Sequence, residues 1–233
     1  AASDVYKRQS LQCQILMGRI SEAQSQLRFL KEMTGEKENV AELRLCEALI
    51  INATSKDLTA MLSLVQESFN AQKKDLGRER SGYGAIVELC PPVLLLMAQV
   101  LLNHCPSYPD SYMGTTQTNC IEQCIVILEL LGRYAPGIAY TQLLQAKSYF
   151  LLEKIDAAKM QITKVLRLNP TDAEAHVLLA QMYIFTENGD LAHQELEQAP
   201  LELAPEDSMA IWTNLDNSWG PAGALNNKVI KHH

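Results

Sequence analysis

The sequence predicts an all-α fold, a solenoid of antiparallel helix pairs, and three observations support this. From Ser10 onward, apolar residues recur at three- and four-residue spacing, as they do along one face of a helix. No run of alternating residues is long enough to predict a useful strand. Pro136, Pro170 and Pro205 follow one another at intervals of 34 and 35 residues, which indicates a repeat. Units of this length bury their apolar faces by stacking on neighbours, so a solenoid is expected.

Composition excludes several classes of partner. The 233 residues include 20 basic and 27 acidic side chains, and the net charge of -7 repels nucleic acid and anionic lipid. The longest apolar run, Pro91 to Leu102, is shorter than the roughly 20 residues that cross a bilayer, so no membrane insertion is expected. No secretory leader is recognised, and a cytoplasmic location is the expectation.

The first helix is expected after a short leader. Residues 1–9, AASDVYKRQ, show no apolar period and are interpreted as a non-native leader. Ser21 and Gln24 have the spacing of a capping box, which predicts that a helix starts there. Gly35 is expected to end this helix, since glycine readily adopts the left-handed conformation that closes helices.

Two further helices complete the N-terminal helical hairpins, which we assign to residues 10–76. Apolar stripes predict a helix from Val40 to Ala53 and an antiparallel partner from Lys56 to Gln72. The charged, glycine-containing stretch from Lys73 to Gly84 is interpreted as a solvated connector and not as a phosphate-binding loop.

Residues 77–135 are predicted to hold a helix pair with an inserted loop. Pro91 and Pro92 suit a first helical turn, where the missing N–H has no partner, and the helix should run to about His104. After a proline-containing loop, a second amphipathic helix is predicted from Cys120 to Tyr134.

Cysteine spacing raises the alternative of a zinc site. The six cysteines are scattered without a disulfide framework, which favours reduced thiols. Cys120 and Cys124 lie four residues apart on a predicted helix, downstream of His104 and Cys105, and four such ligands could hold zinc. Neither half has the usual knuckle spacing, and cysteine is an ordinary small core residue, so no metal site is predicted.

Residues 136–170 and 171–205 align as two units of one repeat. When Ala139 and Ala173 both start a unit, small and large residues coincide at the positions where paired helices approach each other. This is the tetratricopeptide repeat (TPR) pattern of helix, turn and helix. Either Thr171 or Asp172 can cap the helix that follows. The residues expected to pack the repeats are Ala146, Tyr149, Ala158, Ile162, Val165, Pro170, Leu179, Ala180, Tyr183, Ala192, Leu196 and Ala199.

The repeat pattern ends before the chain does. Pro200 falls where the second helix of the last unit would continue, and it should stop that helix near Ala199 because it lacks a backbone donor. Residues 206–233 are interpreted as a divergent or disordered tail.

Several stretches together resemble the tetratricopeptide repeat protein 21 family. They are SEAQSQLRFLKE at 21–32, VLLLMAQVLLNHCPSYP at 93–109, YAPG at 134–137 and LRLNPTDAEAHVLLAQMYIFTENGD at 166–190. The resemblance covers about residues 20–199 and implies a fragment from toward the C-terminal end of longer members. It implies a non-catalytic scaffold, the large TPR subunit of the intraflagellar transport A complex, that acts in retrograde transport. Implied partners are the WD-repeat and TPR subunits of that complex, and implied locations are the cilium, its basal body and its axoneme.

A binding surface is expected on the concave face of the solenoid, which the first helix of each pair supplies. Mixed aromatic and aliphatic side chains there suit a protein partner, although any one of them could instead pack against neighbouring repeats. The candidate partner-binding residues are Tyr140, Leu143, Lys147, Phe150, Leu151, Glu174, Val177, Gln181, Ile184 and Phe185.

Two other classes of function are alternatives to a scaffold. A TPR adaptor of the co-chaperone kind clamps a peptide carboxylate with basic and amide side chains. Of the four positions that would form the clamp, only Lys147 carries a positive charge. His176 and His193 have glutamates nearby but no nucleophile or metal-ligand set, so no catalytic residue, enzyme activity or cofactor is predicted. His176 is interpreted as the occupant of a packing position.

Overall fold

The computed structural model describes residues 10–15, 17–34, 40–55, 57–76, 84, 86, 89–109 and 113–199. Expectations for the leader, for Gly35, for Pro200 and for the tail at 206–233 lie outside these residues. The chain divides into two compact units, one up to Lys154 and one from Ile155. All regular elements of the described residues are helices, so the predicted all-α class of antiparallel helix pairs is confirmed.

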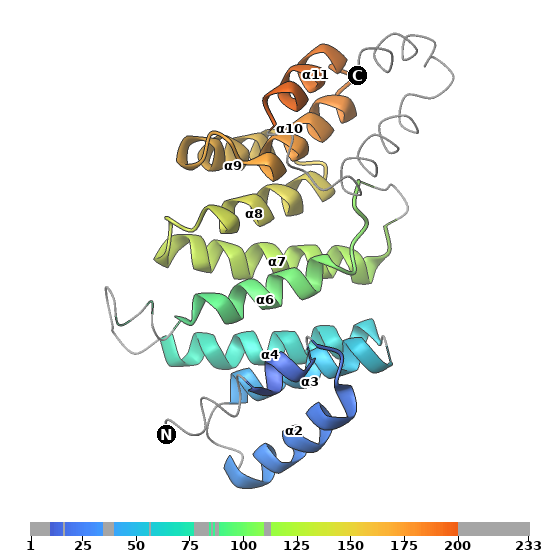
Figure 1. Ribbon diagram of the computed structural model, residues 1–233, viewed down its shortest axis with the longest axis vertical. Coiled ribbons are helices and arrows are strands. Elements are labelled where there is room, and N and C mark those ends of the chain that lie inside the picture. Colours follow the sequence, from blue (N-terminus) through green and yellow to red (C-terminus); the bar gives the residue numbers. More distant parts are fainter. Residues whose placement is uncertain are drawn as a thin grey trace. The chain divides into compact units, whose positions relative to one another are not determined.

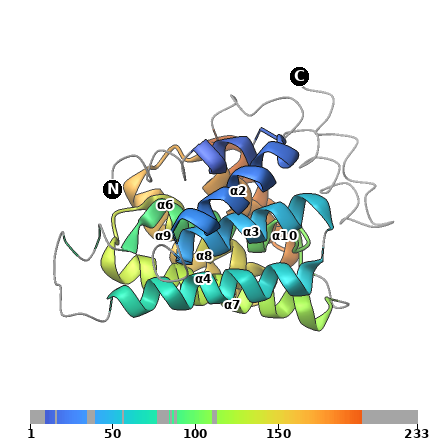
Figure 2. The same cartoon turned by 90° about the horizontal axis from the view of Figure 1, so that it is seen from below.

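Two layers of helices form the first unit. In one layer, α3 (Val40–Thr54), α6 (Pro91–Leu102) and α8 (Ala139–Leu151) follow one another, and in the other α4 (Leu58–Leu76) lies beside α7 (Thr115–Tyr134). The pairs α3/α4 and α6/α7 each connect the layers, and α2 (Ile20–Thr34) packs on α3, as Figure 1 shows. Figure 2, turned by 90°, separates the two layers.

Three helices form the described part of the second unit. These are α9 (Ile155–Leu168), α10 (Ala173–Phe185) and α11 (Gly189–Gln198), and α10 packs against both of the others. The end of α11 at Gln198 agrees with the predicted stop near Ala199.

Local hydrogen bonds correct three of the predicted helix starts. The capping box at Ser21 is wrong, because α2 begins at Ile20 and the Ala23 N–H donates to the Arg19 carbonyl at 3.0 Å. The start at Lys56 is also wrong, because Asp57 precedes α4 and accepts from the amides of Thr59 and Ala60 at 3.1 Å. A side-chain acceptor there satisfies donors that the first turn leaves free.

The third correction concerns α7, which begins at Thr115 and not at Cys120. The first turn is polar, so apolar periodicity could not predict it. Hydrogen bonds of the Gln117 side chain stabilise this turn. The Oε1 atom of Gln117 accepts from the Gly114 N–H at 3.2 Å, while its Nε2 donates to the His104 carbonyl at 3.3 Å.

The same turn occurs twice, 34 residues apart. Glu153 after α8 and Glu187 after α10 have φ values of 57° and 59°, in the left-handed region. The next amides, Lys154 and Asn188, donate to the carbonyls of Tyr149 and Tyr183 at 2.9 and 2.8 Å. These are the bonds that close a helix when a left-handed residue follows it. The 34-residue period in the sequence is therefore a period in the backbone.

The core of the first unit is a contiguous set of apolar side chains. Each fully buried leucine, isoleucine or methionine contributes about 1.5–3 kcal/mol relative to exposure. Polar side chains link helices at the edges of this core. Gln72 Nε2 of α4 donates to the Leu89 carbonyl, just before α6, at 2.8 Å, and His104 Nε2, just after α6, lies 2.6 Å from Asn52 Oδ1 of α3. The largest side chains with less than 2% exposure include Leu45, Met61, Leu94, Met97, Leu101, Leu128 and Leu131.

Candidate protein-interaction surfaces

The predicted binding residues of α8 divide between core and surface. Leu143, Phe150 and Leu151 are buried, and the Phe150 ring stands edge-on to Tyr108 with the ring centres 5.4 Å apart. Tyr140 is 38% exposed, and its hydroxyl accepts a hydrogen bond of 2.8 Å from Gln99 of α6. Lys147 is half-buried. Tyr140 and Lys147 are thus the members of this group that solvent reaches.

The predicted binding residues of α10 are more exposed. Glu174 lies on the surface, Gln181, Ile184 and Phe185 are half-buried, and Val177 is buried. Because α8 belongs to the first unit and α10 to the second, each group stands by itself here, and their union in one binding surface stays a prediction.

The residues assigned to repeat packing also differ in exposure. Seven are buried: Ala146, Ala158, Ile162, Val165, Ala180, Ala192 and Ala199. Tyr149, Leu179, Tyr183 and Leu196 are half-buried, and Pro170 is exposed. Tyr183 receives the ammonium of Lys159 over its ring at 4.5 Å from the centre, which links α10 to α9.

Asp172 and His176 fix the start of α10. Of the two candidate caps, Asp172 accepts from the Ala175 N–H at 3.0 Å, while Thr171 bonds to Asn169 instead. His176, only 4% exposed, places Nδ1 at 2.9 Å from Glu195 Oε2 and Nε2 at 3.0 Å from the Pro170 carbonyl. Both ring nitrogens are therefore used in holding α10 to α11 and to the preceding loop.

The cysteines whose spacing raised the alternative of a zinc site make other contacts. Cys105 and Cys124 donate to the carbonyls of Leu101 and Ala98 at 3.4 and 3.7 Å. Burial raises the pKa of Cys105 and Cys124 to about 12 and that of Cys120 to about 11, which keeps them protonated at neutral pH. Within the described part of the chain, no three histidine, cysteine, aspartate or glutamate side chains gather into a possible metal site.

A groove between α4 and α7 was not predicted from the sequence. Its volume is about 690 Å³, and its walls are the outward faces of these two helices. Leu62 and Val126 lie in it, and Val126 is 51% exposed although it is apolar. Glu67 and Glu122 also line it. The exposed Val126 at the edge of the predicted apolar stripe of α7 was the one signal that could have indicated it.

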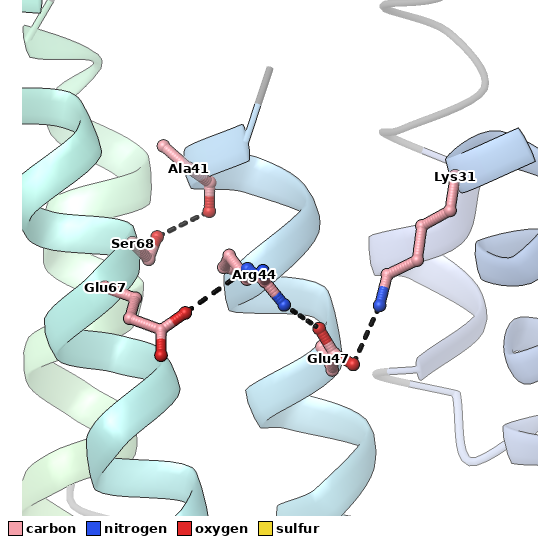
Figure 3. A network of polar contacts seen from close by, with 6 residues as sticks. All are labelled: Lys31, Ala41, Arg44, Glu47, Glu67 and Ser68. Atoms are coloured by element: carbon pink, nitrogen blue, oxygen red, sulfur yellow. Dashed lines mark hydrogen bonds and ion pairs between the residues drawn. The ribbon is translucent and has the colours of Figure 1, made fainter. Parts of the chain in front are cut away.

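Figure 3 shows the polar contacts that fix one wall of this groove. The Nε atom of Arg44 lies 3.4 Å from Glu67 Oε2, and its Nη1 lies 3.2 Å from Glu47 Oε2. Glu47 also binds Lys31 of α2 at 2.7 Å. These half-exposed ion pairs contribute little stability individually, but together they orient Glu67 from helix α3.

The described residues thus offer exposed helical surfaces for binding. None of the described helices combines the length and apolar character that crossing a membrane requires. The structure thus directs attention to two helical surfaces of the first unit: the one at Tyr140 on α8 and the groove between α4 and α7.

Comparison with known structures supports the fold. The chain superposes on MamA MSR-1 C2 with a TM-score of 0.54 at 15% identity, over 85% of this chain and 95% of that one. A second structure, the MamA RS-1 ArsTM double mutant, gives a TM-score of 0.53 at 14% identity, over 93% and 98% of the two chains. Such low identity supports the shared helical architecture alone.

Comparison of sequences identifies relatives. Over 187 residues, 80% of this chain, the sequence is 32% identical to tetratricopeptide repeat protein 21B of Homo sapiens, and over 191 residues, 81%, it is 28% identical to tetratricopeptide repeat protein 21A of Mus musculus. The chain spans 14% of the length of each. Residues 2–187 match the domain described as the tetratricopeptide repeat protein 21 second ARM domain, a match that includes most of the segment set apart as a leader. The chain therefore belongs to the tetratricopeptide repeat protein 21 family.

Proposed function

We propose that this chain is a non-catalytic protein-interaction segment of a larger scaffold, the TPR subunit of the intraflagellar transport A complex. The observation that carries the proposal is the family match over residues 2–187. In this role the segment contributes to complex assembly and to retrograde transport, in the cytoplasm and in the cilium with its basal body and axoneme. Its partners are the WD-repeat and TPR subunits of the same complex.

The alternative of a co-chaperone-like clamp has little support from the side chains. Two of its four positions, Leu143 and Val177, are buried and apolar, and Gln181 is half-buried and uncharged. Lys147 alone offers a charge, while a bound carboxylate needs several converging donors. A binding mode that uses the outer faces of helices suits this chain better.

The test uses the full-length family protein, tagged and expressed in ciliated cells that lack their own copy. A chain that lacks residues 10–199 should lose part of the complex on co-purification and should slow retrograde particles along the axoneme. Complete recovery of all subunits together with normal retrograde velocity would contradict the proposal.

Point variants then test the α8 surface. Tyr140→Ala with Lys147→Ala removes the two side chains of that group that solvent reaches, without opening the core. Met160→Ala, at a 57% exposed position in the second unit, is the control for loss of an exposed side chain. If the first variant alone recovers less of the other subunits, the α8 surface is assigned as a binding surface. If both variants recover equal amounts, Tyr140 and Lys147 are not contacts.

A further inference from the structure

We propose that the groove between α4 and α7 binds an amphipathic helix of a partner protein, with an apolar ridge flanked by lysine or arginine. The inference rests on the proposed scaffold function and adds to it a site and the chemistry of the partner. The site lies in the α4/α7 layer of the first unit, whereas the predicted binding residues of α8 belong to the other layer.

The shape of the groove suits a helix. One wall is a stripe of α4 that contains Thr59, Leu62, Ser63, Gln66 and Glu67, which have the spacing of a single helical face. Because a helix rises 1.5 Å per residue, this stripe is about 12 Å long, slightly more than two turns. The facing wall, on α7, has the same spacing from Asn119 through Glu122 and Gln123 to Val126.

The groove has an apolar lining as well as a polar one. Leu62 on α4 is half-buried, and Val126 on α7 leaves half of its surface in water. Phe69 and Ile127 also line the groove and are buried. A partner side chain placed between the two helices would remove the remaining apolar surface from water, which is the main source of affinity at helix-in-groove sites.

The backbone of both walls favours a helical partner over an extended one. Residues 59–69 and 119–127 belong to regular helices, so their amides and carbonyls are already paired. The first amides of α4 pair with Asp57 and the others pair within the helices. An extended peptide would find no sheet edge to pair with, and its own backbone groups would be left unsatisfied. A helix satisfies its backbone internally and presents only side chains to the groove.

The charge of the groove specifies the flanks of that helix. Its described lining includes the carboxylates of Glu67 and Glu122 and no lysine or arginine. Arg44 engages one oxygen of Glu67, and in Figure 3 the other oxygen points away from the guanidinium. Glu122, which is exposed, has no hydrogen bond or ion pair to another described residue. Basic side chains would complement both carboxylates, while acidic ones would be repelled.

Amide groups add a polar contact across the groove. Gln123 Nε2 of α7 donates to Gln66 Oε1 of α4, which ties the two walls together between the carboxylates. Because α4 packs directly against α7, the walls keep their spacing without a ligand. Little rearrangement is then needed when a partner helix binds.

The test uses the full 233-residue chain and three synthetic 14-residue peptides with a fluorescent label. The first has leucines at three- and four-residue spacing flanked by lysines, the second carries glutamates in place of the lysines, and the third carries a proline at the centre of the lysine version. Fluorescence polarisation should show binding of the lysine peptide that weakens as salt is added. The glutamate and proline peptides should bind at least tenfold more weakly.

Variants of the chain locate the binding site. Glu67→Gln with Glu122→Gln should weaken binding of the lysine peptide about tenfold. Val126→Lys should weaken it by a similar factor, because it places a long side chain and a repelling charge in the groove. Glu32→Gln with Asp156→Asn makes the same change of charge at exposed positions outside the groove and should leave the affinity unchanged. Met33→Lys, at a 60% exposed position of α2, is the control for Val126→Lys.

The outcomes separate this proposal from the proposed function. Absence of peptide binding, equal binding of the lysine and glutamate peptides, or an unchanged affinity in both groove variants would overturn the groove assignment. None of these results contradicts the proposed function, because the complex-assembly experiment tests that function independently of the groove. If circular dichroism shows that the double glutamine variant does not fold, the Val126→Lys variant and the dependence of binding on salt test the groove assignment instead.

Discussion

The imidazole of His176 bridges two acceptors: Glu195 Oε2 at 2.9 Å from Nδ1 and the Pro170 carbonyl at 3.0 Å from Nε2. The ring is 4% exposed and joins α10 to α11 and to the loop that precedes α10. Both neighbours offer oxygen acceptors, so each ring nitrogen lies within hydrogen-bond distance of one of them. His176, a residue type common in catalytic sites, thus stabilises the packing of α10 against its neighbours.

His176→Ala should lower the free energy of unfolding by about 2–3 kcal/mol, because it removes two buried hydrogen bonds and leaves a cavity. His193→Ala is the matched control in the same unit, since its imidazole is exposed and pairs with Glu197 only at 3.5 Å. Its effect should be below about 0.5 kcal/mol. Urea unfolding followed by circular dichroism measures both, and equal midpoints would refute the structural role.

Ala158→Leu should destabilise the chain by about 1–3 kcal/mol, because Ala158 is completely buried and a larger side chain overpacks its surroundings. The adjacent Ala157 is half-buried, and Ala157→Leu should change stability by much less. Comparing the two melting temperatures tests the assignment of Ala158 as a close-packing position of the repeat. A greater loss in the Ala157 variant would contradict it.

Alkaline pH should weaken the fold through Cys124. Burial raises the pKa of this thiol from 9.0 to about 12, so above pH 9 the folded chain retains a proton that the unfolded chain loses. The stability contribution is complete below pH 9 and falls as the pH rises toward 12. Unfolding measured from pH 8 upward should therefore show a shallower decline for Cys124→Ala than for the unaltered chain.

Cys13→Ala is the control for the alkaline series, because Cys13 is exposed. Its pH profile should coincide with that of the unaltered chain. A Cys124→Ala profile with the original slope would show that another group dominates the alkaline loss.

Glu187→Gly should stabilise the second unit. Glu187 has a φ of 59°, which costs an L-residue about 1–2 kcal/mol, whereas glycine adopts this conformation freely. The greater entropy of glycine in the unfolded chain offsets part of the gain, so about 0.5 kcal/mol is expected. Glu174→Gly, inside α10, should instead cost about 1 kcal/mol. Chemical unfolding measures both changes, and opposite signs of the change in the free energy of unfolding would confirm the turn geometry.

Features set by neighbouring residues could be predicted from the sequence. Apolar periodicity predicts the helix pairs. The sequence also offers two caps for α10, Thr171 and Asp172, and Asp172 is the one used. The helix stop near Ala199 followed from the backbone chemistry of the proline beyond it. In each case the deciding contact lies within a few residues along the chain.

Contacts between distant residues could not be predicted in this way. The pairs His104–Asn52 and Gln72–Leu89 depend on how helices are juxtaposed in space. The groove needs two outward helical faces 57 residues apart in sequence, those of Gln66 and Gln123, to lie side by side. The amphipathic pattern of a single helix predicts only that such a face is exposed to solvent. It does not predict which other helix lies beside that face.

The recurrence of the Glu153 turn at Glu187 has a consequence for how chains of this kind change length. Both turns bring the backbone back to the same local geometry after 34 residues. Removal or duplication of that many residues would connect two turns of the same geometry and would keep the following helices in the same phase. A change of any other length would shift each following helix out of phase with the one before it, so insertions of arbitrary size belong in the loops between helices.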